Sequence, residues 1–204
     1  PTLAPFDVIS DMWRGMRGSM LDMYRCPDKL IEAQDILLPM MLGAALANAQ
    51  AMGEKRIFIP LHRGADGFMS VAQFEKFYWP HLKALIFGLI EAGLTPVPFF
   101  EGTYDQRLKY LRELPPGEVV AWFDRTDMAC AKEQVGDVVC LMGNMPVSLL
   151  QSGTPEQVRA YTKYLCETAG KGGGYMMTTN TTLDDCHPDL VRVWVDATRE
   201  YGAY

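Results

Sequence analysis

The sequence predicts an α/β fold with a mainly parallel sheet, and three observations lead to that prediction. Five short apolar or β-branched runs follow residue 55, each of strand length: Arg56–Leu61, Thr95–Phe100, Val119–Phe123, Val138–Met142 and Gly174–Thr178. Their hydrophobicity is continuous rather than alternating, which is typical of strands that are buried on both faces. Amphipathic stretches of helical length separate them, and such alternation of strand and helix is characteristic of βαβ units.

The first 54 residues are predicted to be helical. Met and aromatic residues interleave with Arg and Gly over Ser10–Tyr24, which indicates a short helix. A longer helix is expected to begin at Pro27, because proline suits the first turn, and to run to Met52. A kink is expected at Pro39, where a backbone donor is missing.

Capping signals bound the later helices. Helices are expected over Ser70–Ala92, Tyr104–Leu114, Met128–Gln134, Thr154–Ala169 and, after the last strand, Pro188–Tyr201. Ser70 and Thr154 are placed as N-caps, with Gln157 completing a capping box after Thr154. Gly93, Gly136 and Gly170 are expected to end helices in the left-handed conformation.

The length of 204 residues supports one domain over residues 1–204, helical over 1–54 and built of strand-helix units over 55–204. A (β/α)8 barrel needs eight strands and roughly 250 residues. About five units are present, so from periodicity alone the sheet is either open or lacks three strands. The chain starts at Pro1 without an initiator Met, and we expect it to be part of a longer protein.

Composition excludes several classes of protein. Lys and Arg total 19 against 25 Asp and Glu, for a net charge of -6 without a dense basic run, which argues against nucleic acid as a partner. The five cysteines form no CxxC pair and favour a reducing cytoplasm. The longest apolar stretch, Ile36–Ala47, is too short to span a bilayer, so no membrane partner is expected.

Polar residues follow all five predicted strands: His62 and Arg63, Glu101, Asp124 and Arg125, Gly143 and Asn144, and Asn180. Active sites of parallel α/β folds form at the carboxyl ends of strands, because the loops that follow converge there. We therefore expect these side chains to share one pocket.

Three of these residues are the candidate catalytic groups. His62 is suited to act as a base, a metal ligand or a substrate clamp, or equally as a loop histidine bonded to backbone. Glu101 follows two phenylalanines, whose apolar surroundings favour a raised pKa or a metal; the alternative is an ion pair with Arg107 or another nearby cation. Asp124 is suited to anchor a cationic or NH-bearing ligand.

The remaining residues are candidates for substrate binding. Arg63 and Arg125 are the strand-end cations that would hold carboxylates. Gly143 allows close approach of the backbone to a ligand, and Asn144 and Asn180 add amide donors and acceptors, although Gly-Asn is also common turn chemistry. Asp127 is expected to cap the helix that follows it.

The chain resembles the uroporphyrinogen decarboxylase superfamily, which includes zinc-dependent methyltransferases acting with corrinoid proteins. The resemblance is carried by His62, Phe68–Pro80 and Glu91–Pro98, and continues in order through Gly143–Pro146, Gly153–Val158 and Gly173–Met176. It implies a (β/α)8 TIM barrel of which this chain is the C-terminal part, with about five of the eight strand-helix units.

Departures from the family pattern bear on the reaction. The resemblance places a tyrosine around Phe6 and, for decarboxylases, a histidine where this chain has Asn180-Thr181-Thr182. The His-x-Cys motif of the methyltransferases falls on Phe99-Phe100-Glu101, and their second Cys falls near Thr181. A zinc site would therefore be rebuilt from Glu101 and His62, or an acid such as Asp124, with oxygen replacing sulfur.

The resemblance implies an enzyme, and methyl transfer from a small methylated donor to a corrinoid protein is slightly favoured. The alternatives are decarboxylation of uroporphyrinogen, a lyase reaction of porphyrin biosynthesis, and a non-catalytic barrel that binds a tetrapyrrole. The expected partners are the methyl donor or tetrapyrrole, a corrinoid protein and a second copy of the chain in a homodimer.

Overall fold

The computed structural model describes residues 1–203, and its centre is a five-stranded sheet. All neighbouring strands are parallel and follow the order β1-β2-β3-β4-β5. The strands are β1 (Arg56–Leu61), β2 (Thr95–Phe100), β3 (Val120–Phe123), β4 (Cys140–Met142) and β5 (Tyr175–Met176). The five predicted strands are thus confirmed. The last is shorter than predicted, since β4 offers only three residues to pair with.

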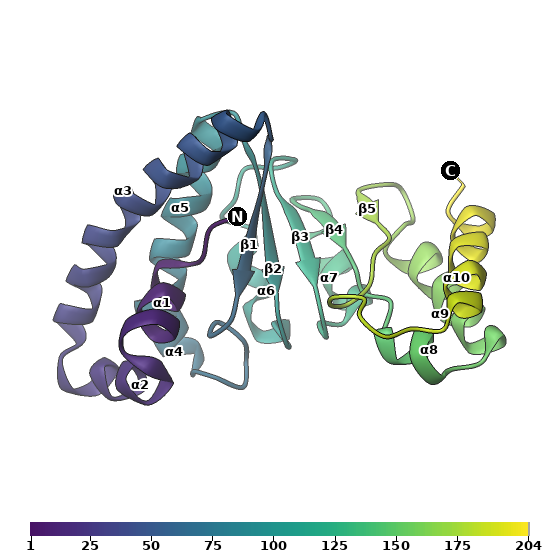
Figure 1. Cartoon of the computed structure of the whole chain (residues 1–204), viewed down its shortest axis with the longest axis horizontal. Helices are drawn as coiled ribbons and strands as arrows, with labels where there is room; N and C mark the ends of the chain where they lie inside the picture. The colour runs from purple at the N-terminus through teal and green to yellow at the C-terminus, as the bar shows by residue number, and fades with distance from the viewer. Residues whose placement is uncertain (204) are drawn as a thin grey trace.

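Helices precede the sheet and connect its strands (Figure 1). Before β1 lie α1 (Pro5–Val8), the π-helix η1 (Ile9–Trp13), α2 (Gly15–Arg25) and α3 (Pro27–Met52). The connections hold α4 (Val71–Gln73), the π-helix η2 (Phe74–Tyr78), α5 (Trp79–Glu91), the 3₁₀-helix η3 (Asp105–Arg107), α6 (Leu108–Leu111), α7 (Met128–Val135), α8 (Val147–Ser152) and α9 (Pro155–Thr168); α10 (Pro188–Tyr201) follows β5. Of these, α8 has no counterpart among the predicted helices.

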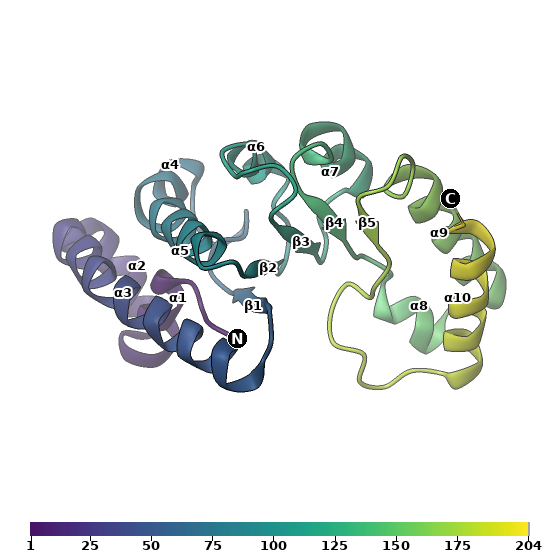
Figure 2. The same cartoon turned by 90° about the horizontal axis from the view of Figure 1, so that it is seen from above.

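The sheet is curved, with helices on its convex side (Figure 2). Leu61, Ala121, Phe123 and Leu141 are completely buried and belong to one hydrophobic cluster with buried residues of α5, α6 and α7. The opposite, concave side carries a row of aromatic rings, in which Phe99 lies 6.2 Å from Phe58 and 4.5 Å from Trp122 between centroids. Phe58 is 37% exposed whereas Phe99 is 7% exposed, so the expectation of burial on both faces holds only in part for this face.

Helix α3 is the longest element, and it is continuous from Pro27 to Met52 with Pro39 inside it. By length and composition, with a mean hydropathy of 1.5 over 18 residues, it meets the requirements of a membrane span. At 26 residues, the helix is longer than the apolar stretch Ile36–Ala47 on which the sequence-based expectation of no membrane span was based. It also packs against α1, α2, α5 and β1, and 22% of its most apolar 18-residue window is buried.

The predicted N-caps are confirmed, whereas two of the three glycines predicted to end helices are not in the left-handed conformation. Ser70 and Thr154 both close capping boxes, accepting a hydrogen bond from the backbone N–H of the glutamine three residues later. Gly93 has a positive φ of 75°, as expected. Gly136 instead has φ -66°, and Gly170 is not among the glycines with positive φ, because the last turns of these helices continue in right-handed geometry.

Candidate functional site

The first part of the site is the loop that begins where β1 ends, and a carboxylate from α1 holds it. Asp7 is completely buried. One carboxylate oxygen accepts the backbone N–H of Arg63 at 3.0 Å; the other accepts the backbone N–H of His62 at 3.0 Å and the hydroxyl of Tyr78 at 2.6 Å. The segment before the sheet is therefore part of the site.

Burial raises the pKa of the Asp7 carboxyl from 3.8 to about 6, and the hydrogen bonds from Tyr78 and the His62 backbone oppose this rise. Burial, together with the nearby negative charge of Asp7, raises the pKa of Tyr78 well above 10. The tyrosine therefore remains the donor to the carboxylate at neutral pH.

A second carboxylate on the same helical segment binds the side chains of this loop. Asp11 Oδ2 lies 2.5 Å from His62 Nδ1, and its Oδ1 lies 2.8 Å from a terminal nitrogen of the Arg63 guanidinium. The guanidinium also lies 5.0 Å from the centroid of the Phe68 ring, a cation–π arrangement. His62 and Arg63 are thus held by one acidic side chain between them.

Sequence reasoning missed Asp7 and Asp11. Their spacing of four residues in a helical region puts both carboxylates on one face, and this was the available signal. The resemblance had instead directed attention to Phe6, which is 1% exposed and packs in the hydrophobic core.

Glu101 faces His62 across the cleft. Its Oε2 lies 4.0 Å from His62 Nε2, and its side chain is 51% exposed. The alternative partner considered from the sequence, Arg107, is buried and instead bonds to the carboxylate of Asp66 and the carbonyl of Met69. Glu101 is thus available to a molecule that enters the cleft.

Asp124, at the end of β3, connects neighbouring strand ends. Its Oδ2 accepts the backbone N–H of Gly102 at 2.9 Å, and its Oδ1 accepts the side-chain amide of Asn180 at 2.7 Å. Arg125 extends towards solvent with a side chain 76% exposed, its Nε 3.8 Å from Asp124. Both carboxylate oxygens of Asp124 are therefore hydrogen-bonded, and the residue holds neighbouring strand ends together at the wall of the site.

Gly143 and Asn144 fix the next strand end. Gly143 has φ 119°, and a Cβ there would lie 2.5 Å from the carbonyl oxygen of Phe123. Asn144 is 5% exposed and donates its side-chain amide to the carbonyls of Asp124 and Thr126, both at 3.1 Å. This pair therefore ties β3 to β4. Asn180 does the same for the following loop, since its side-chain oxygen accepts the Val147 N–H at 2.9 Å.

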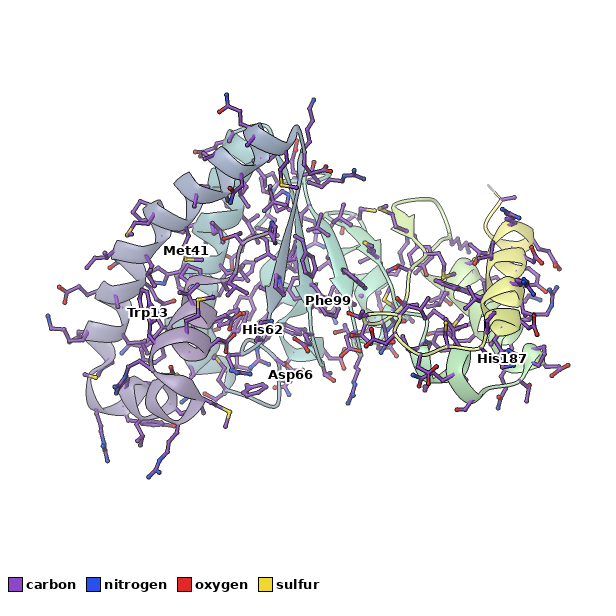
Figure 3. The ribbon with its side chains drawn as sticks, in the orientation of Figure 1. Trp13, Met41, His62, Asp66, Phe99 and His187 are labelled. Carbon is purple, nitrogen blue, oxygen red and sulfur yellow. The ribbon has the colours of Figure 1, made fainter. Side chains whose placement is uncertain are left out.

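Two cavities lie along this edge of the sheet. A cavity of about 490 Å³ is lined by His62, Arg63, Ala65, Phe68, Glu101, Gly102, Asp124 and Arg125. A larger cavity of about 940 Å³ shares Asp124 and Arg125 with it and is otherwise lined mainly by hydroxyl, amide and carboxylate side chains from the loops after β2–β5 and from α8 and α9, including Asn144, Asn180, Tyr161 and Tyr164. The structure thus brings His62, Glu101 and Asp124 to a common cavity, as Figure 3 indicates for His62 at the end of β1.

The charges in the smaller cavity are closely matched. Arg63 is bound to Asp11 and Arg125 lies beside Asp124, while Glu101 adds a carboxylate whose nearest charged partner is His62. The cavity therefore offers little net positive charge to a ligand.

The donors fall short of a zinc site. Among residues 1–203, no group of three or more His, Cys, Asp or Glu side chains is placed to hold a metal ion. Zinc sites with a catalytic role use three protein ligands, whereas His62 and Glu101 supply two facing donors. The residues described here do not complete a metal centre.

Comparisons with known proteins bear on the ancestry of this site. Curated relatives described as uroporphyrinogen decarboxylase include that of Psychromonas ingrahamii, 32% identical over 66% of this chain and 38% of the relative. Those of Mus musculus and Cellvibrio japonicus are 27% and 25% identical over 82% and 99% of this chain, and 45% and 56% of their own lengths. The chain thus spans about half the length of these relatives or less.

A solved structure shares the fold. A methyltransferase from Methanosarcina mazei superposes with a TM-score of 0.80 and 20% sequence identity, over 98% of this chain and 57% of that one. The predicted relation to a TIM barrel is thereby confirmed, with five parallel strands present in this chain. A sequence profile described as uroporphyrinogen decarboxylase (URO-D) matches residues 2–201. The chain therefore belongs to the uroporphyrinogen decarboxylase family.

Proposed function

We propose that the protein is a methyltransferase that transfers the methyl group of a small methylated donor to a corrinoid carried by a partner protein. The observation that carries the proposal is a histidine bonded through Nδ1 to Asp11, with Nε2 directed at a cavity that has little net positive charge. The corrinoid would supply the electron pair that takes up the methyl group. What remains for this chain is to bind the donor and assist departure of its other part.

His62 is the residue suited to that assistance. When the bond between the methyl carbon and its oxygen, sulfur or nitrogen breaks, the electron pair stays on that heteroatom, which then needs a proton. A protonated imidazole would supply it from Nε2 while Asp11 stabilises the positive charge through Nδ1. Glu101, 4.0 Å from Nε2, would orient the donor.

The charge distribution favours a small donor over a polycarboxylate. Uroporphyrinogen carries several carboxylates, which would need unpaired cations for binding. Arg63 is already bound to Asp11, and Arg125 is exposed beside Asp124. A neutral methylated donor avoids the repulsion from Glu101 that a carboxylate would meet.

The larger cavity supports the choice of acceptor. Its hydroxyl and amide side chains, among them Ser148, Gln151 and Tyr164, can hydrogen-bond the amide substituents at the edge of a corrin ring. Because it shares Asp124 and Arg125 with the smaller cavity, donor and acceptor would meet at this wall. We propose a cytoplasmic location for the protein, and a homodimer as its assembly.

The deciding experiment supplies the protein with each class of substrate. Reduced corrinoid is mixed with a panel of methoxy, methylthio and methylamino compounds, and methylation is followed by the corrinoid absorption spectrum. A parallel reaction contains uroporphyrinogen and is analysed for stepwise loss of carboxyl groups, which the names of the curated relatives make the competing outcome. We expect corrinoid methylation; decarboxylation would refute the proposal, and tetrapyrrole binding without turnover would indicate a non-catalytic barrel.

The zinc implied by the family resemblance is tested separately. Metal content is measured in the purified protein and in Glu101→Ala. With only two facing donors in the described chain, we derive no step through a metal. Stoichiometric zinc that is lost in Glu101→Ala would restore the metal-assisted mechanism, whereas zinc retained by the variant would exclude Glu101 as its ligand.

A further inference from the structure

The backbone of the loop after β1 has an unusual hydrogen-bond partner. Strand β1 ends at Leu61, and the next two N–H groups, of His62 and Arg63, donate to no backbone carbonyl within the described part of the chain. Both donate to Asp7, at 3.0 Å each. Consecutive N–H groups that converge in this way form a concavity that attracts an anion. Here a side chain of the same protein fills that concavity.

We propose that Asp7 is the positioning residue of the candidate site: its carboxylate fixes the His62–Arg63 backbone so that both side chains project to Asp11 and the cavity. The consequence for catalysis rests on the proposed function, whereas the positioning itself rests only on the geometry. Asp7 is completely buried and is not among the residues that line the cavity, so it acts through its neighbours.

Packing on the other side of the carboxylate holds it in place. Tyr78 donates its hydroxyl to Asp7 at 2.6 Å. The loop fits closely against this tyrosine, because a Cβ on Gly64 would lie 2.7 Å from the Tyr78 ring and 2.6 Å from the Tyr104 hydroxyl. Tyr104 itself donates to the carbonyl of Leu61 at 3.4 Å. Any shift of the loop would therefore disturb two buried tyrosines.

The two acids of the N-terminal segment divide the task. Asp7 binds the loop backbone, and Asp11, one helical turn later, binds the two side chains. The segment is anchored along β1 by the Thr2 N–H, which donates to the Phe58 carbonyl at 3.0 Å. Since both acids lie on one helical segment, displacement of that segment would move the backbone and the side chains of the loop together.

The substitution that tests the proposal is Asp7→Asn. It preserves the size of the side chain but leaves a single acceptor oxygen, so that the new NH2 group faces one of the two backbone N–H donors. We expect amide hydrogen exchange at His62 and Arg63 to accelerate about tenfold or more, while exchange in α9 and α10 stays as in the wild type. The matched variant Tyr78→Phe removes one hydroxyl but leaves both backbone bonds to Asp7, so these two amides should change by less than about threefold.

Two further readouts separate positioning from general loss of structure. The NMR chemical shifts of the His62 imidazole should change in Asp7→Asn, because its Nδ1 would no longer meet Asp11 at 2.5 Å. If methyl transfer is observed, Asp7→Asn should lower kcat by a larger factor than it changes KM. The first readout needs no activity, so failure of the proposed function leaves it intact.

Wild-type protein provides a test that does not depend on folding of the variant. The amides of His62 and Arg63 should exchange slowly, as in β1, although no backbone carbonyl of the described chain accepts them. Exchange in the wild type as fast as in the loop at Thr181–Thr182 would overturn the proposal. So would a folded Asp7→Asn protein with unchanged exchange at both amides and unchanged chemical shifts of the His62 imidazole.

Discussion

The two halves of the candidate site are built in different ways. The half at β1 and β2 consists of titratable side chains, His62, Arg63 and Glu101, two of which are held by an acid more than 50 residues earlier in the chain. The half at β3–β5 is a network of amides, backbone groups and one carboxylate, Asp124, whose members lie at neighbouring strand ends. In the first half, His62 Nε2 and Glu101 face the cavity, whereas in the second half Asp124, Asn144 and Asn180 are bonded to one another or to the backbone.

This difference indicates which half supplies reactivity and which supplies rigidity. A histidine that exposes one nitrogen to a cavity can exchange a proton, whereas a buried amide network resists movement because each lost bond leaves an unpaired polar group. We therefore expect substitutions in the first half to affect turnover most, and those in the second to affect stability most.

The largest effect is expected for His62→Ala. Loss of the proton donor should reduce kcat for methyl transfer by about 10²–10⁴-fold, since general acid catalysis contributes on that scale. The control is His187→Ala, because His187 lies far from the β1 loop (Figure 3) and its side chain is 59% exposed. Comparable kcat values for the two variants, measured at saturating donor, would contradict the assignment of the reactive group to the first half.

In the second half, Asp124→Ala should cost about 2–4 kcal/mol of unfolding free energy, because it leaves the Gly102 N–H and the Asn180 amide without their acceptor. Urea unfolding measures this. The control is Asp137→Ala, which removes an exposed ion pair with Arg112 and should therefore reduce the unfolding free energy far less. Equal losses in the two variants would show that the network contributes no more than a surface pair.

The unfolding free energy should also depend on pH through Asp7, which supports the first half of the site. Because the pKa of Asp7 is raised from 3.8 to about 6, the folded protein binds this proton more tightly than the unfolded chain. Its contribution to stability is fully present below 3.8 and is lost as the pH rises through about 6, by at most about 3 kcal/mol. The unfolding free energy of the wild type minus that of Asp7→Asn should fall over this range.

Asp22→Asn provides a control with the opposite sign. Arg14 lowers the pKa of Asp22, so its contribution to stability is present above 3.8 and is lost as the pH falls below that value. A difference between wild type and Asp7→Asn that stays constant from pH 4 to 7.5 would contradict the raised pKa of Asp7.

The smallest effect is expected for Arg125→Gln. The side chain is 76% exposed and belongs to the wall that both cavities share, so KM for an uncharged methyl donor should change less than about threefold. A rise in KM of tenfold or more would show that a carboxylate of the substrate is bound here. That outcome would favour decarboxylation of uroporphyrinogen as the reaction and would assign substrate binding to the second half.

The strands and the positions of the candidate residues could be predicted because they depend on local pattern. Continuous apolar runs located β1 and β2 to the residue, and the rule that loops converge at carboxyl ends placed His62, Glu101 and Asp124 along one cavity. The Thr154 capping box and the Asp127 N-cap were likewise visible as short-range signals, and both are confirmed.

Long-range partners could not be predicted in this way. Nothing near His62 in the sequence indicates Asp11, 51 residues away, and Arg107 was considered for Glu101 although it bonds to Asp66. Asn144 was expected to face a ligand, yet most of its hydrogen-bonding capacity is used between strand ends. Each of these choices depends on which groups meet in space.

By itself, the sequence determined the alternation of strand and helix, the family and the edge of the sheet where polar side chains collect, because periodicity, capping and strand direction are encoded within short stretches. Only the tertiary structure decided that a helix before the sheet places Asp7 beneath the first loop and Asp11 against its side chains. The physical reason is that burial of a carboxylate is tolerated where several donors converge on it, and that convergence exists only once the chain has folded.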